Sequence, residues 1–132
     1  MSDSLLGHMY LEGVMVEMDY EKARKHLERA AKKEDIPSLF SIGKMFSKGW
    51  SYPLDYEMAI KLYRKASERN YRYAINNLGV LYKRGMGVQK SFSKALELYK
   101  IAADLKYPGS INNIGTPFPT FRIFPLFFYP QS

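Results

Sequence analysis

The stretch AINNLGVLYKRGMGV, at residues 74–88, decides the fold, because two earlier stretches repeat its pattern. SLFSIGKMFSKGWSY occupies residues 38–52 and SDSLLGHMYLEGVMV occupies residues 2–16, so the pattern returns every 36 residues. Each stretch has Leu or Ile directly before a glycine, an aromatic residue three positions after that glycine, and a second glycine three positions further on. A fixed period of this length predicts a tandem array of small helical units.

Six positions keep a constant chemistry with this 36-residue period, and four of them lie outside the three stretches. They are two glycine positions, one helix-capping position, one aromatic position and two alanine positions: Gly7, Gly43, Gly79 and Gly115; Gly13, Gly49 and Gly85; Asp19, Asp55 and Ser91; Tyr20, Tyr56 and Phe92; Ala23, Ala59 and Ala95; Ala30, Ala66 and Ala102. Because these positions keep their chemistry from copy to copy, we expect each of them to serve the fold of the repeat.

Each copy is predicted to contain two helices. Ala74, Leu78, Leu81 and Tyr82 share one stripe of a first helix, the spacing expected when one helix face is buried. The second glycine of each copy, such as Gly85, can adopt a left-handed conformation and end that helix.

The second helix of each copy is predicted to begin after Asp19, Asp55 or Ser91, whose side chains can accept hydrogen bonds from free backbone N–H groups. Its inner face takes the small and apolar residues Ala59, Leu62, Tyr63 and Ala66. Pro37 fits the first turn of the following helix, where its missing N–H is not needed. The predicted fold class is therefore all-α, a solenoid of helix-turn-helix repeats.

The repeats are expected at residues 2–37, 38–73 and 74–109, with a partial fourth copy at 110–115, so that the solenoid covers residues 1–115. Residues 116–132 form a tail rich in proline and aromatic residues. We expect this tail to be a truncation scar; the alternative is an apolar strap over the open end of the solenoid. The incomplete copy could also support self-association through Ile111, Ile114 and the aromatic tail.

These residues resemble the Sel-1-like repeat family, a subclass of tetratricopeptide-like repeats. The third copy carries the closest match to the family pattern: Ala74, Leu78, Gly79, Tyr82, Gly85, Gly87, Val88, Lys94, Ala95, Ala102 and Ala103. The resemblance implies a right-handed superhelix whose first helices line a concave face. It also implies a role as an adaptor or scaffold in protein–protein interaction.

The sequence offers no recognisable set of catalytic or metal-binding residues. The chain has no cysteine, and its two histidines, His8 and His26, fall on different predicted helices. No serine lies in a nucleophile motif. We therefore expect no enzyme activity, catalytic residue, metal site or cofactor. No secretory signal and no apolar run of about 18 to 20 residues is seen, so a cytoplasmic location without a membrane span is the default expectation.

Outward positions on the first helices differ between the copies, and such positions are where a solenoid can make individual contacts. We expect the partner-binding residues there, in a mixed aromatic, amide and basic groove suited to an acidic peptide or protein surface: Phe40, Lys44, Lys48, Asn76, Asn77, Lys83 and Arg84.

Two alternatives remain open at this stage. The net charge of +7 would support binding to nucleic acid or another polyanion. We nevertheless expect a protein partner, because the basic residues are spread over all three copies among acidic neighbours such as Glu21, Glu28, Glu57 and Glu68. The second alternative is that the chain is a piece of a larger repeat protein without independent function.

Overall fold

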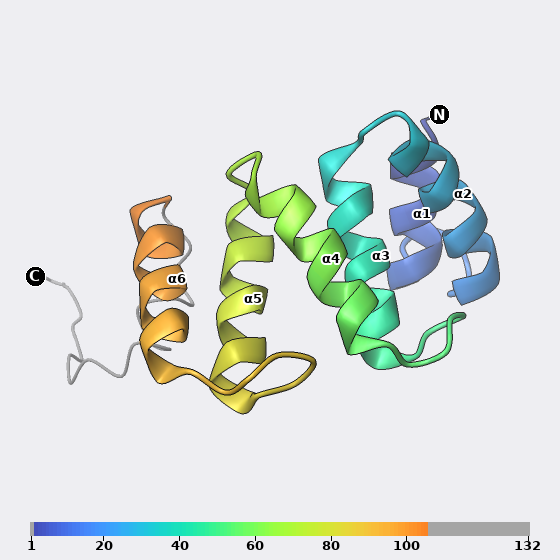
Figure 1. Cartoon of the computed structure of the whole chain (residues 1–132). Coiled ribbons are helices and arrows are strands. Elements are labelled where there is room, and N and C mark those ends of the chain that lie inside the picture. Colours follow the sequence, from blue (N-terminus) through green and yellow to red (C-terminus); the bar gives the residue numbers. More distant parts are fainter. Residues whose placement is uncertain (1, 106–132) are drawn as a thin grey trace, which may run out of the picture.

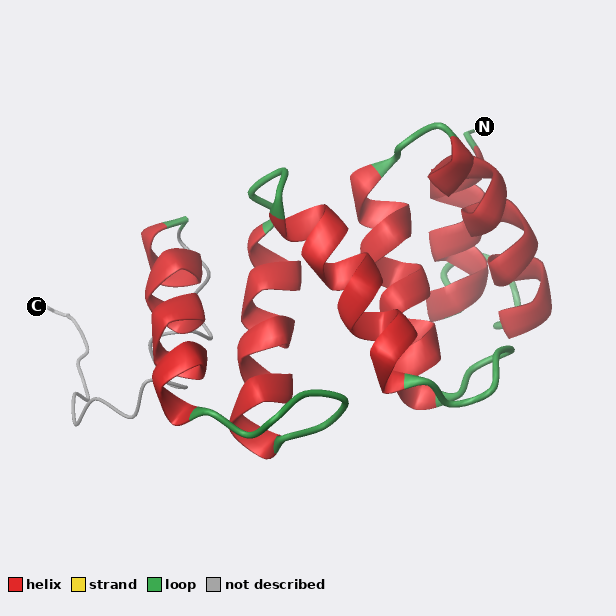
Figure 2. Ribbon diagram, in the orientation of Figure 1, coloured by secondary structure: helices red, strands yellow, loops and turns green. Residues whose placement is uncertain are grey.

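The computed structural model describes residues 2–105, which form six α-helices (Figure 1). Their bounds are α1 Asp3–Glu12, α2 Tyr20–Lys32, α3 Ile36–Lys48, α4 Tyr56–Ser67, α5 Arg72–Arg84 and α6 Phe92–Asp104. No strand occurs within residues 2–105 (Figure 2). The helices pack as the pairs α1–α2, α3–α4 and α5–α6, and the pairs follow one another along the molecule. The prediction of an all-α solenoid of helical repeats is confirmed.

The helix ends lie where the repeated positions predicted them. The backbone N–H groups of Lys22, Met58 and Lys94 donate to the side chains of Asp19, Asp55 and Ser91 at 3.1, 3.0 and 3.1 Å. At the other end of the first helices, the terminating glycines are left-handed, with φ angles of 70°, 72° and 68° at Gly13, Gly49 and Gly85. Glycine adopts this conformation without steric cost, which explains why a glycine recurs at the end of each first helix.

Asp35 provides a cap that the repeat pattern did not predict. Its carboxylate accepts from the backbone N–H of Ser38 at 3.1 Å and from the Ser38 hydroxyl at 2.6 Å, and Pro37 occupies the first turn of α3 as expected. Burial alone would raise the pKa of Asp35, but the hydrogen bonds from Ser38 and Ser4 and the nearby His8 outweigh burial and lower it. The start of α3 is thus held by a charged cap.

The core is built from the alanine positions and the aromatic or leucine side chain beside them. Four of the repeated alanines are fully buried: Ala23, Ala59, Ala66 and Ala102. The larger side chains of Leu27 and Tyr63 are at most 2% exposed. Leu62, expected on the inner face of α4, is only half-buried and packs between the repeats instead.

Three predictions fall on residues outside the described part of the chain. They are the partial fourth copy at 110–115, the nature of the tail at 116–132, and self-association through Ile111 and Ile114. None of the helices within residues 2–105 is long and apolar enough to cross a membrane.

Replacing Gly79 with alanine should destabilise the fold, although alanine is normally the better helix former. A Cβ atom at Gly79 would lie 2.6 Å from Cε1 and 2.9 Å from Cδ1 of the buried Tyr99 ring. A rigid ring cannot yield as a flexible side chain would, so we expect a loss of about 1–3 kcal/mol in urea unfolding followed by circular dichroism. The exposed helical variant Ser93→Ala is the control and should change stability by less than about 0.5 kcal/mol. An equally stable Gly79→Ala protein would show that the helices do not approach this closely.

Asp35→Asn should remove part of the acid sensitivity of the fold. Because the folded-state pKa of Asp35 lies below the ordinary value of 3.8, the ionised cap stabilises the folded state above that value. This contribution is lost as the pH falls through the lowered folded-state pKa. Unfolding from about pH 6 to about pH 2 should therefore show wild type and Asp35→Asn converging in stability as the pH falls. A gap that stays constant over this range would contradict the assignment.

Candidate functional site

A groove of about 430 Å³ lies between α3 and α5. We call it the α3–α5 groove, and twelve residues line it: Phe40, Lys44, Ser47 and Lys48 from α3; Tyr56 and Tyr63 from α4; Tyr73, Asn77, Val80, Leu81 and Arg84 from α5; and Met86 from the turn after α5. The groove thus crosses the junction between the second and third helix pairs. A hollow of this size can accept one or two side chains of a bound segment.

Aromatic rings form one wall of the groove. Phe40 packs against Tyr63, Tyr71 and Tyr73, with ring centroids 5.6, 5.4 and 6.3 Å apart, and Tyr71 meets Tyr73 edge to face at 5.4 Å. These tilted geometries are the favourable ones for aromatic pairs. The rings hold one another in place, so the wall is a preformed apolar surface.

The floor of the groove carries neutral polar groups around Tyr63. The Asn77 amide donates to the Tyr63 hydroxyl at 3.5 Å, and the Ser47 and Tyr63 hydroxyls lie 3.5 Å apart. Burial raises the pKa of Tyr63, although both hydrogen-bonding neighbours act in the opposite direction. Tyr63 therefore remains a neutral hydroxyl at physiological pH, and the groove floor carries no negative charge.

The only charged side chains of the lining are the cations Lys44, Lys48 and Arg84; no Asp or Glu is among the twelve residues. Within residues 2–105, the ion pairs join Arg24 to Glu28, Asp3 to Arg29 and Lys65 to Glu34, and His26 Nδ1 lies 3.0 Å from Asp3 Oδ1. None of the groove cations takes part in them. The groove consequently has an uncompensated positive charge beside an apolar wall.

The structure brings together five of the seven residues predicted to bind a partner. Phe40, Lys44, Lys48, Asn77 and Arg84 all line the groove. Whether they bind a partner remains a prediction. Lys83 is exposed on α5 but does not line the groove.

The placement of Asn76 on the outward surface is wrong. Its side chain is only 4% exposed, because α5 packs against both α4 and α6 and its buried arc is therefore wider than the expected stripe. A helix covered on two sides buries residues next to its main stripe, and residue 76 directly follows the buried Ile75.

Seven of the twelve residues that line the groove were not predicted from the sequence, among them Tyr56, Tyr73 and Met86. Tyr56 and Tyr63 are seven residues apart and therefore lie on the same face of α4, a signal that could have linked them. Tyr73 precedes Asn77 by four residues on α5, which gives the same kind of signal. No signal in the sequence indicates Met86, because its position depends on how the turn after α5 folds back.

At the junction between the first and second helix pairs, a side-chain contact bridges α1 and α3 at positions whose equivalents line the α3–α5 groove. His8 Nε2 lies 2.7 Å from Ser41 Oγ, and His8 Nδ1 lies 2.7 Å from the backbone oxygen of Ser4. His8 and Ser41 occupy the repeat positions that Lys44 and Asn77 occupy one junction later. The contact joins α1 to α3, and Ser41 is only 5% exposed, so it is a structural link within the solenoid.

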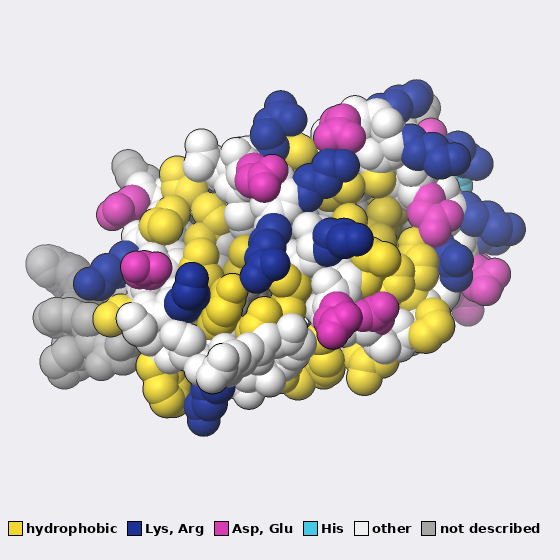
Figure 3. Space-filling view, viewed as in Figure 1, with side chains coloured by type: hydrophobic (Ala, Val, Ile, Leu, Met, Phe, Trp, Pro, Cys, Tyr) yellow, Lys and Arg dark blue, Asp and Glu magenta, His cyan; other side chains and the backbone are white. Residues whose placement is uncertain are grey.

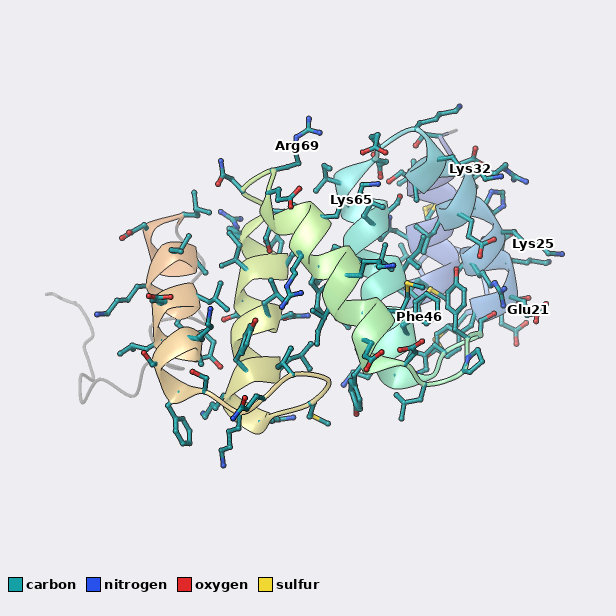
Figure 4. All side chains as sticks on the ribbon, viewed as in Figure 1. Glu21, Lys25, Lys32, Phe46, Lys65 and Arg69 are labelled. Carbon is teal, nitrogen blue, oxygen red and sulfur yellow. The ribbon has the colours of Figure 1, made fainter. Side chains whose placement is uncertain are left out.

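The face formed by α2 and α4 has a different character (Figures 3 and 4). Lysine and arginine side chains, including Lys25, Lys65 and Arg69, are interspersed with acidic side chains and separated by apolar surface. Arg24 pairs with Glu28 at 3.1 Å, and Lys65 pairs with Glu34 at 3.3 Å. This face carries no continuous patch of one sign.

Across residues 2–105, no group of three or more His, Cys, Asp or Glu side chains could hold a metal ion.

Comparison with known proteins finds one repeat family and solved structures of the same fold. The family model described as the Sel1 repeat matches three times, at residues 3–35, 36–71 and 72–107. A Sel1 repeat protein from Oxalobacter formigenes has a similar structure, with a TM-score of 0.80 and 32% sequence identity. The protective antigen c5321 of uropathogenic Escherichia coli, described as having an SLR fold, has a TM-score of 0.78 and 27% identity. No curated protein matches the sequence.

The alignments differ in how much of each neighbour they cover. They include 86% of this chain in both cases, but only 46% of the Oxalobacter protein and 24% of c5321, so this chain spans less than half of either. Cysteine rich protein B of Helicobacter pylori aligns over 83% of this chain and 85% of its own length, with a TM-score of 0.69 and 21% identity, and supports the fold alone. With three family matches covering most of its length, the chain belongs to the Sel1 repeat family.

Proposed function

We propose that this protein is a non-catalytic interaction module whose α3–α5 groove binds an acidic peptide segment of a protein partner. Sel1 repeat proteins generally mediate protein–protein interaction, which makes a protein the expected class of ligand. The observation that carries the proposal is the lining of the groove: three cations, no carboxylate and a preformed aromatic wall. The module would serve as an adaptor or scaffold.

Each part of the lining has a distinct role in this proposal. The Phe40 and Tyr73 rings offer apolar surface, and burying one apolar side chain of a peptide there would contribute about 1.5–3 kcal/mol. Arg84 can bind a carboxylate through two parallel hydrogen bonds, whereas Lys44 and Lys48 act as point charges. A preferred ligand is therefore an apolar or aromatic residue flanked by Asp or Glu.

Neutral groups on the floor would contact the backbone of the ligand. Asn77 and Ser47 lie beside the Tyr63 hydroxyl and can donate to or accept from a peptide group. These contacts do not depend on peptide sequence, so specificity would come from the cations and the aromatic wall. Charge complementarity of this kind mainly speeds association and suppresses wrong partners.

The proposal can be tested with a displayed library of random peptides selected on the immobilised full chain. We expect the selected peptides to be enriched in Asp and Glu around one apolar or aromatic residue. The triple variant Lys44→Glu, Lys48→Glu, Arg84→Glu should bind the selected peptides at least about 100-fold more weakly, because each reversed charge repels the ligand. Fluorescence anisotropy with a labelled selected peptide measures the change, and circular dichroism checks that helicity is retained.

A matched triple variant separates the groove from bulk charge. Lys25→Glu, Lys61→Glu, Arg69→Glu makes the same change in net charge at exposed sites outside the groove. We expect it to bind the peptide within about threefold of wild type, since exposed distant charges are largely screened by salt. Equal losses in the two triple variants, or stronger retention on heparin than on any peptide, would favour the polyanion alternative and refute the groove.

A further inference from the structure

The turn that joins the two helices has the same backbone in all three repeats. Met15, Ser51 and Gly87 occupy the same repeat position and all have positive φ angles, of 66°, 64° and 76°. The residues on either side are apolar or aromatic in every repeat: Val14 and Val16, Trp50 and Tyr52, Met86 and Val88. Three turns that share a positive φ angle and apolar flanking residues can make similar contacts.

The second and third turns each pack on the second helix of the preceding repeat. The Trp50 ring stacks on Tyr20 at 4.9 Å, and Arg24 Nη1 donates to the Ser51 backbone oxygen at 2.6 Å. One repeat later the corresponding contacts involve Tyr56 and Ile60. A Cβ atom at Gly87 would lie 2.8 Å from Tyr56 Cβ and 2.9 Å from Ile60 Cδ1.

The third repeat presents the same two positions of its second helix without such a turn. Phe92 corresponds to Tyr20 and Tyr56, and Leu96 corresponds to Arg24 and Ile60. Ile60 is 3% exposed beneath the third turn, whereas Leu96 is 38% exposed and Phe92 is 63% exposed. We call the surface of Phe92 and Leu96 the α6 socket. Within residues 2–105, no turn covers it.

The first turn, at residues 13–16, is the counterpart at the other end of the solenoid. Val14 is 49% exposed and Met15 is 88% exposed, because no repeat precedes α1 within the described residues. Within residues 2–105, the first turn and the α6 socket therefore correspond in repeat position to surfaces that contact each other twice, with Met15 in place of Ser51 and Gly87.

Charge also favours this pairing. The acidic side chains Glu12 and Glu17 flank the first turn. Around the α6 socket, Lys90 lies with its ammonium group 5.0 Å from the Phe92 ring centroid, and Lys100 follows Leu96 by one helical turn. All four charged side chains are exposed. Opposite charges around an apolar contact favour its correct orientation.

We propose that a second copy of this chain docks its first turn on the α6 socket, so that copies associate end to end and continue the stack of repeats. This contact is heterologous, because the two copies contribute different surfaces. After one contact forms, a free turn and a free socket remain at the two ends of the pair. Association therefore continues beyond the dimer as the concentration rises.

Sedimentation velocity of the full chain over a range of concentrations tests the proposal. The weight-average mass should rise beyond that of a dimer, without a plateau at two chains. The turn variant Val14→Glu, Met15→Glu and the socket variant Phe92→Glu, Leu96→Glu should each weaken association at least about tenfold. An equimolar mixture of the two variants should form dimers and nothing larger, because only one intact turn–socket pair is left in each complex.

Leu54→Glu is the matched control, since Leu54 is an exposed apolar residue, at 58%, that belongs to neither end surface. It should associate as wild type does, and circular dichroism should show equal helicity in all variants. Three outcomes overturn the proposal. They are a wild type that stays monomeric up to about 1 mM, association that survives the socket variant, and a mixture of the two variants that does not associate. A monomeric wild type would mean that the socket is left open or covered by the chain's own residues.

Discussion

The close approach of the two helices within each repeat is the constraint on which the rest of the structure depends. A glycine of the first helix faces a large side chain of the second: Leu27 at Gly7, Tyr63 at Gly43 and Tyr99 at Gly79. In each case a single added Cβ atom would lie within 3 Å of that side chain. Side-chain packing in protein interiors leaves no room for such an atom. The helix pair is therefore a rigid unit, and the spacing between pairs follows from how these units stack.

The parts of the fold that one repeat determines by itself could be predicted from the sequence. Capping by Asp19, Asp55 and Ser91, termination at the left-handed glycines and the buried alanine positions all depend on neighbours within a few residues or on the partner helix. The burial of Asn76 was not predicted, because it depends on contacts beyond one helix pair: α5 is covered by both α4 and α6. The groove residue Met86 could not be predicted for a similar reason, because its position depends on how the turn after α5 folds back across the junction.

The two junctions between helix pairs differ in the side chains that meet across them. At the first junction a histidine and a serine are complementary partners, and their 2.7 Å contact joins α1 to α3. At the second, the same positions hold Lys44 and Asn77, and both side chains line the open groove. A lysine ammonium has three donors and no acceptor and keeps its charge exposed where it can. The two junctions therefore differ in the side chains at equivalent positions, His8 and Ser41 at the first and Lys44 and Asn77 at the second.

This arrangement divides the sequence into two sets of positions with different structural constraints. Substitutions in the glycine, alanine and capping positions destabilise the helix pair. Substitutions at the junction positions leave the helix pairs intact. A new binding preference can therefore arise at a junction by very few mutations, without compensating changes elsewhere. Duplication of one 36-residue unit would add a junction of the same geometry with an independent choice of side chains. Converting the His8–Ser41 junction into a groove like the second one would need changes at further positions too, because Ser4 and Glu12 stand where Phe40 and Lys48 line the groove.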